Sequence, residues 1–133
     1  MRRTSLITAS LAVAALTLAA CNGDNGDNGA DPADATTNID VLGTDGLDFE
    51  PDSFVVPAGQ EVTVELTSEA GNDHNFIIED LDGADVEVVF ADAGETETGT
   101  FTADNAGTYE FFCDVPGHRE AGMVGTLEVV EEG

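Results

Sequence analysis

The stretch GTYEFFCDVPGHREAGMVGTLEVV, residues 107–130, carries three potential metal ligands within a short segment. Cys113, His118 and Met123 follow one another at intervals of five residues. Their thiolate, imidazole and thioether groups are soft or borderline ligands for transition metals. Sequence typical of β-strands lies on both sides, so we expect all three side chains on one loop between two strands.

The strand that leads into this loop should alternate its side chains between two faces. Tyr109, Phe111 and Cys113 share one face, whereas Glu110 and Phe112 share the other. The face without the glutamate is expected to be buried, which places Cys113 at the rim of the core.

A tight turn is predicted just before His118, because Pro116 and Gly117 favour turns. Such a turn can bring the imidazole back toward Cys113. The chain has two histidines, and the other, His74, begins another predicted strand. In a Greek-key sandwich that strand can lie beside the one ending at Cys113, so that all four potential ligands converge.

Short strands separated by turn residues are predicted from Ile39 onward. The segment EVTVELT alternates most clearly, with Val62, Val64 and Leu66 facing inward. No segment shows a helical period. The strand-like segments are 39–42, 49–56, 61–67, 74–79, 86–90, 95–101, 108–113 and 125–130. Seven or eight strands at this spacing predict an all-β fold, a Greek-key β-sandwich or barrel.

Residues 1–20, MRRTSLITASLAVAALTLAA, have the organisation of a secretory signal peptide. The apolar run is shorter than the about 20 residues of a membrane span. It ends in Leu-Ala-Ala-Cys, which resembles the lipobox of bacterial lipoproteins and implies cleavage before Cys21 and its lipidation. An ordinary secretory signal with a chance cysteine is the alternative, and both Sec and twin-arginine export remain open.

Residues 21–38 repeat Asn, Gly and Asp without an apolar run, which predicts a lipidated, disordered acidic linker. A single folded domain is expected over residues 39–133. The chain has 28 acidic residues and only three arginines or lysines, for a formal net charge of −25. This charge repels phosphate and excludes nucleic-acid binding. It fits either a high-salt host or a basic partner.

The ligand types favour copper. One thiolate, two imidazoles and a weak thioether match the trigonal His₂Cys arrangement of copper electron-transfer sites, with a long axial Met. Structural zinc, the main rival, prefers four Cys or His ligands. Cys113 and His118 could also be a nucleophile and its base, although that reading leaves Met123 and His74 unexplained. Taken singly, a buried Cys or Met is more often part of a core.

The segment YEFFCDVPGHREAGMVGTLEV resembles the copper loop of the cupredoxins, the small blue copper proteins. The segment His74-Asn75-Phe76 resembles their upstream ligand strand, and the resemblance covers residues 39–130. It implies a Greek-key sandwich with one type 1 copper ion. The ligands that it implies are His74, Cys113, His118 and Met123.

The resemblance also implies supporting roles. Asn75 would steady the ligand loop and the thiolate, since its amide can both donate and accept. The carbonyl of Asp73 could approach the metal as a second weak axial group. His118 would be the exposed ligand and the electron port. The apolar rim for partner docking would comprise Val115, Pro116, His118, Ala121 and Gly122.

We therefore expect a monomeric type 1 copper electron carrier, anchored through Cys21 to the outer face of the cytoplasmic membrane. Its partners would be redox proteins such as a cytochrome or an oxidase. In composition the chain is also similar to the acidic, tethered halocyanins. A copper-binding or copper-delivery module without a redox partner is the alternative, since it shares all four ligands. An enzyme is not expected, because further copper centres need histidines and both are already used.

Overall fold

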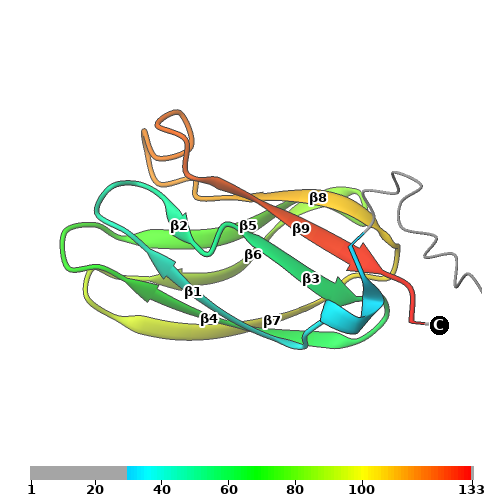
Figure 1. Cartoon of the computed structure of the whole chain (residues 1–133). Coiled ribbons are helices and arrows are strands. Elements are labelled where there is room, and N and C mark those ends of the chain that lie inside the picture. The colour runs from blue at the N-terminus through cyan, green and yellow to red at the C-terminus, as the bar shows by residue number, and fades with distance from the viewer. Residues whose placement is uncertain (1–29, 133) are drawn as a thin grey trace, which may run out of the picture.

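Nine strands form two sheets that pack face to face in the computed structural model, which describes residues 30–132 (Figure 1). One short 3₁₀ turn, η1 (Pro32–Asp34), is the only helical element in that range. The strands are β1 (Asn38–Gly43), β2 (Phe49–Glu50), β3 (Ser53–Pro57), β4 (Glu61–Ser68), β5 (His74–Leu81), β6 (Ala84–Ala91), β7 (Thr96–Thr102), β8 (Gly107–Phe112) and β9 (Val124–Val130). The predicted all-β sandwich is confirmed.

The strand order brings the two ligand-bearing strands together. One sheet has the order β2-β1-β4-β7, and the other has the order β3-β9-β8-β5-β6. The β1–β4 and β3–β9 pairs are parallel, and the remaining pairs are antiparallel. β5 lies beside β8 through the pairs Ile77–Phe112 and Ile78–Phe111. Because these strands are antiparallel, the start of β5 lies beside the end of β8, as predicted.

The segment predicted as one strand over residues 49–56 is two strands that belong to different sheets. β2 pairs with β1, whereas β3 pairs with β9. Pro51 and Asp52 separate them. Proline has no N–H for a strand ladder, so the pairing stops there and the chain crosses to the second sheet. This crossing explains nine strands where seven or eight were predicted.

The core is filled by side chains that alternate inward. Val62, Val64 and Leu66 on β4 are fully buried, as predicted. The rings of Phe76 on β5 and Phe111 on β8 stack with centroids 4.4 Å apart. Burial of such aromatic pairs dominates core energetics. This stack joins the two ligand-bearing strands immediately below the ends that carry Cys113 and His74.

The structure describes the last part of the predicted linker but none of the predicted signal. Residues 1–20, Cys21 and residues 22–29 lie outside the described residues. Closer to the domain, Thr36 donates its N–H to the Val55 carbonyl, and Thr63 donates to the Thr37 carbonyl, each at 2.9 Å. Contacts with both sheets therefore begin a few residues before Ile39. No helix within residues 30–132 has the length and apolar character of a membrane span.

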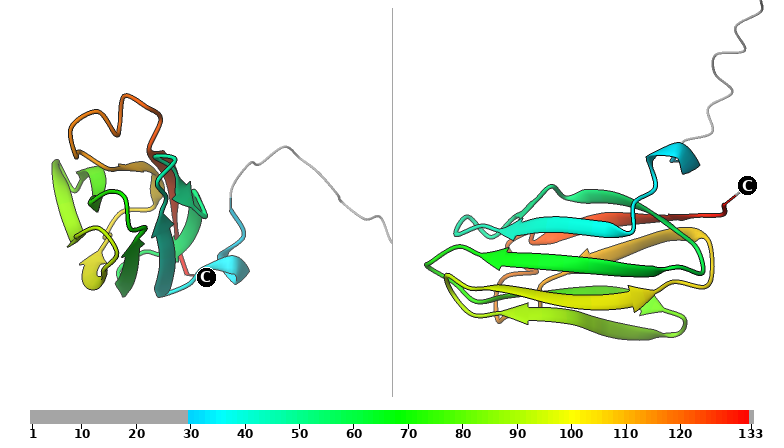
Figure 2. Two further views of the ribbon diagram at one scale, coloured as in Figure 1. Left: turned by 90° about the vertical axis from the view of Figure 1, so that its left-hand side faces the viewer. Right: turned by 90° about the horizontal axis from the view of Figure 1, so that it is seen from below.

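The sandwich has two distinct ends. The loop between β8 and β9 projects at one end, while η1 and the end of the described chain lie at the other (Figures 1 and 2). Gln60 donates to the carboxylate of Glu132 at the end remote from the loop. The candidate ligands are thus separated from both ends of the described chain by the length of the strands.

Candidate metal centre

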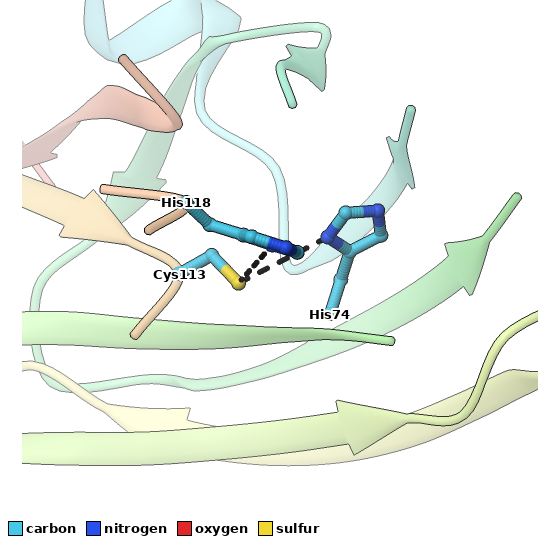
Figure 3. Close-up of side chains that lie close together, drawn as sticks. All are labelled: His74, Cys113 and His118. Carbon is cyan, nitrogen blue, oxygen red and sulfur yellow. Dashed lines mark hydrogen bonds between the residues drawn. The ribbon is translucent and has the colours of Figure 1, made fainter. Parts of the chain in front are cut away.

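Three donor side chains converge where β5 begins and β8 ends (Figure 3). The Sγ atom of Cys113 lies 3.5 Å from Nδ1 of His118 and 3.9 Å from Nδ1 of His74. All three donor atoms lie within 4.8 Å of one another. The two imidazole rings are tilted by 54°, with centroids 5.1 Å apart. The side chains therefore point toward a common position between them.

The strand arrangement accounts for this convergence. His74 is the first residue of β5, and Cys113 follows the last residue of β8. Antiparallel pairing places these two ends side by side. His118 is delivered by the loop, which returns to the sheet through β9. Residues far apart in sequence thus meet because two strand ends and one loop share the same edge of the sandwich.

Backbone hydrogen bonds close the loop on itself. The N–H of His118 donates to the Val115 carbonyl at 2.9 Å, and the N–H of Met123 donates to the His118 carbonyl at 3.1 Å. The N–H of Cys113 donates to the Met123 carbonyl at 3.2 Å. Gly117 has a φ of 86°, in the left-handed region that favours glycine. The predicted turn before His118 is therefore present, and it brings the ring toward Cys113.

The backbone of Met123 is hydrogen bonded to Cys113 and His118, and its side chain is fully buried. Coordination by its thioether remains a prediction, as does an approach of the Asp73 carbonyl. The Asp73 carboxylate accepts a hydrogen bond from the Ala93 N–H at 2.8 Å. That contact fixes the loop just before β5 against the turn after β6.

Asn75 links the two ligand segments. Its backbone N–H donates to Sγ of Cys113 at 3.5 Å. Its side-chain oxygen accepts from the Asp114 N–H at 2.9 Å, and its amide nitrogen donates to Asp114 at 2.6 Å and Glu87 at 2.8 Å. The residues after both His74 and Cys113 are therefore bonded to each other. Glu87 and Asp114 were not predicted, because nothing in their spacing indicates that they meet at Asn75.

Burial sets the protonation of the metal-free centre. It lowers the pKa of His74 below the usual 6.5, and the positive charge that His118 can carry lowers it further. Burial also raises the pKa of Cys113 above the usual 9.0. At neutral pH the centre therefore holds a neutral His74 and a protonated thiol. Because metals bind thiolates, binding here would release a proton.

The donor set fits copper. His74 and Cys113 are fully buried, and His118 is only 6% exposed, so the donors are removed from water. Nδ1 of both histidines faces Sγ of Cys113, so a metal bound between them would use the lone pairs of these three atoms. One thiolate with two imidazoles is the set that copper electron-transfer sites use.

The comparison with known proteins agrees with this geometry. The family model described as copper binding proteins, plastocyanin/azurin family, matches residues 35–130. The chain belongs to this family. His74, Cys113 and His118 are positioned as a single copper site within the described residues of this cupredoxin.

Several relatives of this cupredoxin align over most of their length. Plastocyanin of Scenedesmus fuscus is 37% identical, covering 66% of this chain and 94% of its own. The copper-resistant cuproprotein CopI of Rubrivivax gelatinosus is 28% identical, covering 73% of this chain and 68% of its own. The structure of reduced auracyanin from Roseiflexus castenholzii is 31% identical, with a TM-score of 0.61, covering 72% and 98% of the two chains.

The proposed docking rim lies on the outer side of the cupredoxin loop. Pro116, Ala121 and Gly122 are exposed, and Val115 is half-buried. His118, predicted to be an exposed ligand, is almost covered by its own loop. It is nevertheless the only one of the three donors with measurable surface.

Two residues near the ligands escaped prediction. A Cβ atom at Gly43 on β1 would lie 2.5 Å from Cδ2 of His74, so only glycine leaves room for that ring. Glycine inside a strand is a general signal of close approach. Phe112 was assigned to the solvent face with Glu110, yet it is only 5% exposed because Arg119 covers its ring.

Proposed function

We propose that this cupredoxin is a type 1 copper electron carrier. The observation that carries the proposal is the convergence of one buried thiol and two buried imidazoles within 4.8 Å. The family match and the likeness to auracyanin A of Chloroflexus aurantiacus, described as a blue copper protein, support it. That structure is 29% identical, with a TM-score of 0.62.

The chain's own residues supply a rigid, dry centre. Bound copper would supply a one-electron couple between Cu(I) and Cu(II). His74 is held by a strand, His118 by a hydrogen-bonded loop, and the Cys113 sulfur accepts a hydrogen bond from Asn75. Fixed ligands and excluded water keep structural change between oxidation states small. Met123 would provide the weak axial contact.

Electrons would enter and leave through His118. Of the three donors it alone reaches the surface, at 6% exposure. The rim of Val115, Pro116, Ala121 and Gly122 would seat a redox protein such as a cytochrome or an oxidase. Most charged side chains around this contact would be carboxylates, because the chain has 28 acidic residues and no lysine, and Arg119 is the only arginine among the described residues.

We further propose that a lipid on Cys21 tethers the monomer to the outer face of the cytoplasmic membrane. The lipobox-like Leu-Ala-Ala-Cys supports this assignment. The described chain enters the sandwich at the end opposite to the copper loop (Figure 1). A tether at that end would leave the loop free to meet partners.

Removal of the thiol tests the function directly. Copper-loaded wild-type protein is expected to show the intense visible sulfur-to-copper charge-transfer band. Cys113→Ser should abolish that band, because serine has no thiolate. Cys21→Ser is the matched control, which should keep the band and release the protein from the membrane fraction. Absence of the band from copper-loaded wild type would refute the type 1 assignment.

Copper delivery is the second candidate, and the likeness to a copper-resistant cuproprotein favours it. The two functions differ in what leaves the protein. A carrier should exchange electrons rapidly with a c-type cytochrome and keep its copper. A delivery module should lose its copper to an acceptor apoprotein while electron exchange stays slow.

A further inference from the structure

Arg119 makes an unusual set of contacts directly beside the copper ligands. One guanidinium nitrogen lies 2.8 Å from a carboxylate oxygen of Glu79 and 2.7 Å from one of Glu110. Glu79 belongs to β5 and Glu110 to β8. A side chain of the loop is therefore bonded to both ligand-bearing strands.

The same guanidinium stacks on an aromatic ring. Its central carbon lies 3.8 Å from the centroid of Phe112. Phe112 directly precedes Cys113, and Arg119 directly follows His118. The residues that flank two copper ligands thus touch each other. This contact forms a second bridge between the strand end and the loop, independent of any metal.

The backbone of Arg119 takes part in the loop as well. Its carbonyl accepts a hydrogen bond from the Gly122 N–H at 3.0 Å. The neighbouring His118 carbonyl accepts from both Ala121 and Met123. Fixing the Arg119 side chain on the sheet therefore restrains the segment whose backbone holds His118 in place.

We infer that Arg119 is a positioning residue that holds His118 beside Cys113 before copper binds. The inference concerns the loop of the metal-free protein, and its importance for electron transfer rests on the function proposed above. Without the contacts to Glu79, Glu110 and Phe112, the side chain of Arg119 would leave the sheet. The loop would then sample open conformations in which Nδ1 of His118 moves away from Sγ of Cys113.

Arginine suits this position better than lysine. Its planar group can hydrogen bond in its plane while stacking by its face. Lysine retains the charge but cannot reproduce this combination. The contacts also occupy the guanidinium with two carboxylates, so the only cation of the described surface is already paired. The outer face of β5 and β8 therefore remains acidic toward a partner despite carrying an arginine.

Amide hydrogen exchange of the metal-free full-length protein tests the inference. Arg119→Gln should raise the exchange rates of the His118, Ala121 and Met123 amides at least tenfold, because the loop opens more often. Arg119→Lys should give rates between those of wild type and Arg119→Gln. The Val64 and Leu66 amides on β4 should stay within twofold of wild type, which shows that the fold is intact.

A charge-matched pair separates local contact from general repulsion. Glu79→Gln with Glu110→Gln should raise the exchange of the same loop amides at least threefold. Glu65→Gln with Glu97→Gln removes equal charge from β4 and β7 in the other sheet. This pair should change the exchange rates of the loop amides less than twofold. Rates in Arg119→Gln within twofold of wild type would overturn the inference, as would equal effects of the two glutamate pairs.

A copper-loaded measurement then connects the loop to the site. The copper hyperfine splitting in the paramagnetic-resonance spectrum should change in Arg119→Gln, shift less in Arg119→Lys and stay the same in Glu65→Gln with Glu97→Gln. An unchanged splitting in Arg119→Gln would show that bound copper orders the loop by itself, and would overturn the link from Arg119 to electron transfer. If wild type shows no type 1 spectrum, the proposed function fails while the exchange experiment still tests the loop.

Discussion

Gly43 is a residue of the opposite sheet whose backbone packs directly against the ring of a copper ligand, His74. It ends β1, and a Cβ atom placed there would lie 2.5 Å from Cδ2 and 2.7 Å from Cγ of the His74 ring. Such distances are far below van der Waals contact. A side chain at Gly43 would push the ring out of the position in which Nδ1 faces Cys113. The absence of a side chain at Gly43 therefore leaves the space that this ligand of the opposite sheet needs.

Gly43→Ala is expected to displace His74 and weaken copper binding at least tenfold, with a shift of the visible charge-transfer band. Gly46→Ala is the matched control, because a Cβ atom there would meet only Thr44 and Asp48 at 3.4 and 3.5 Å. Competition with a copper chelator measures both affinities. Equal affinities of the two variants would show that His74 can shift without cost.

At the scale of elements, β8 organises both the core and the centre. Phe111 points inward, where it stacks on Phe76 and meets Phe49 edge-on at 5.1 Å. Phe112 points outward beneath Arg119, and Cys113 follows at the end of the strand. A single strand therefore anchors the aromatic core, supports the loop and delivers the thiol. Loss of its core anchor should affect the entire domain.

Phe111→Ala should lower the free energy of unfolding by about 3–5 kcal/mol, the usual cost of removing a buried phenylalanine ring. Phe90→Ala makes the same change at a ring that is 42% exposed. It should remain within about 0.5 kcal/mol of wild type, as surface substitutions usually do. Denaturant unfolding of the metal-free protein gives both values. Similar losses in the two variants would contradict the central role of the stack.

The alternating pattern of single strands was sufficient to predict the class of fold and most strand positions. Val62, Val64 and Leu66 face the core because alternation in β4 is uninterrupted. The division of residues 49–56 was missed, although polar residues and Pro51 separate Phe49 from Phe54, because such a break does not by itself reveal a change of sheet. The covering of Phe112 was missed because it depends on a loop arginine, which no period within β8 can indicate.

The ligand spacing likewise predicted which donors would meet, because each ligand type is scarce in this chain. Two histidines and one cysteine near predicted strand ends left few combinations. The contacts that orient them were not predictable. Glu79 and Glu110 are two among 28 acidic residues, and sequence alone does not distinguish those that bind Arg119 from those that face water.

At the scale of the whole molecule, charge opposes folding. The chain carries a formal net charge of −25, and its only arginine among the described residues is paired with two glutamates. Like charges at this density repel in the compact state. The Debye length falls from about 30 Å at 0.01 M salt to about 3 Å at 1 M. Added salt should therefore stabilise the domain by screening carboxylates from one another.

The midpoint of thermal unfolding of the metal-free protein should rise steadily between 0.01 and 1 M sodium chloride, concentrations that span about a tenfold change in Debye length. Replacing Glu61, Glu65 and Glu97 by glutamine should raise the midpoint at low salt and make its dependence on salt shallower. These side chains lie on exposed positions of β4 and β7. Repulsion between carboxylates would be shown to be negligible if the unfolding midpoint were independent of salt, or if the midpoint of the variant depended on salt as steeply as that of wild type.

The separation of the two ends of the sandwich has a practical consequence for measurement. A thiol or affinity tag placed at Glu132 would attach the protein to an electrode by the end remote from His118. The metal would then face the solution, and direct current to the electrode would have to cross the length of the strands. Attachment through a residue of the exposed loop, such as Ala121, would reverse this orientation. The same protein could thus be attached to an electrode in two orientations, one with slow and the other with fast electron transfer to the electrode.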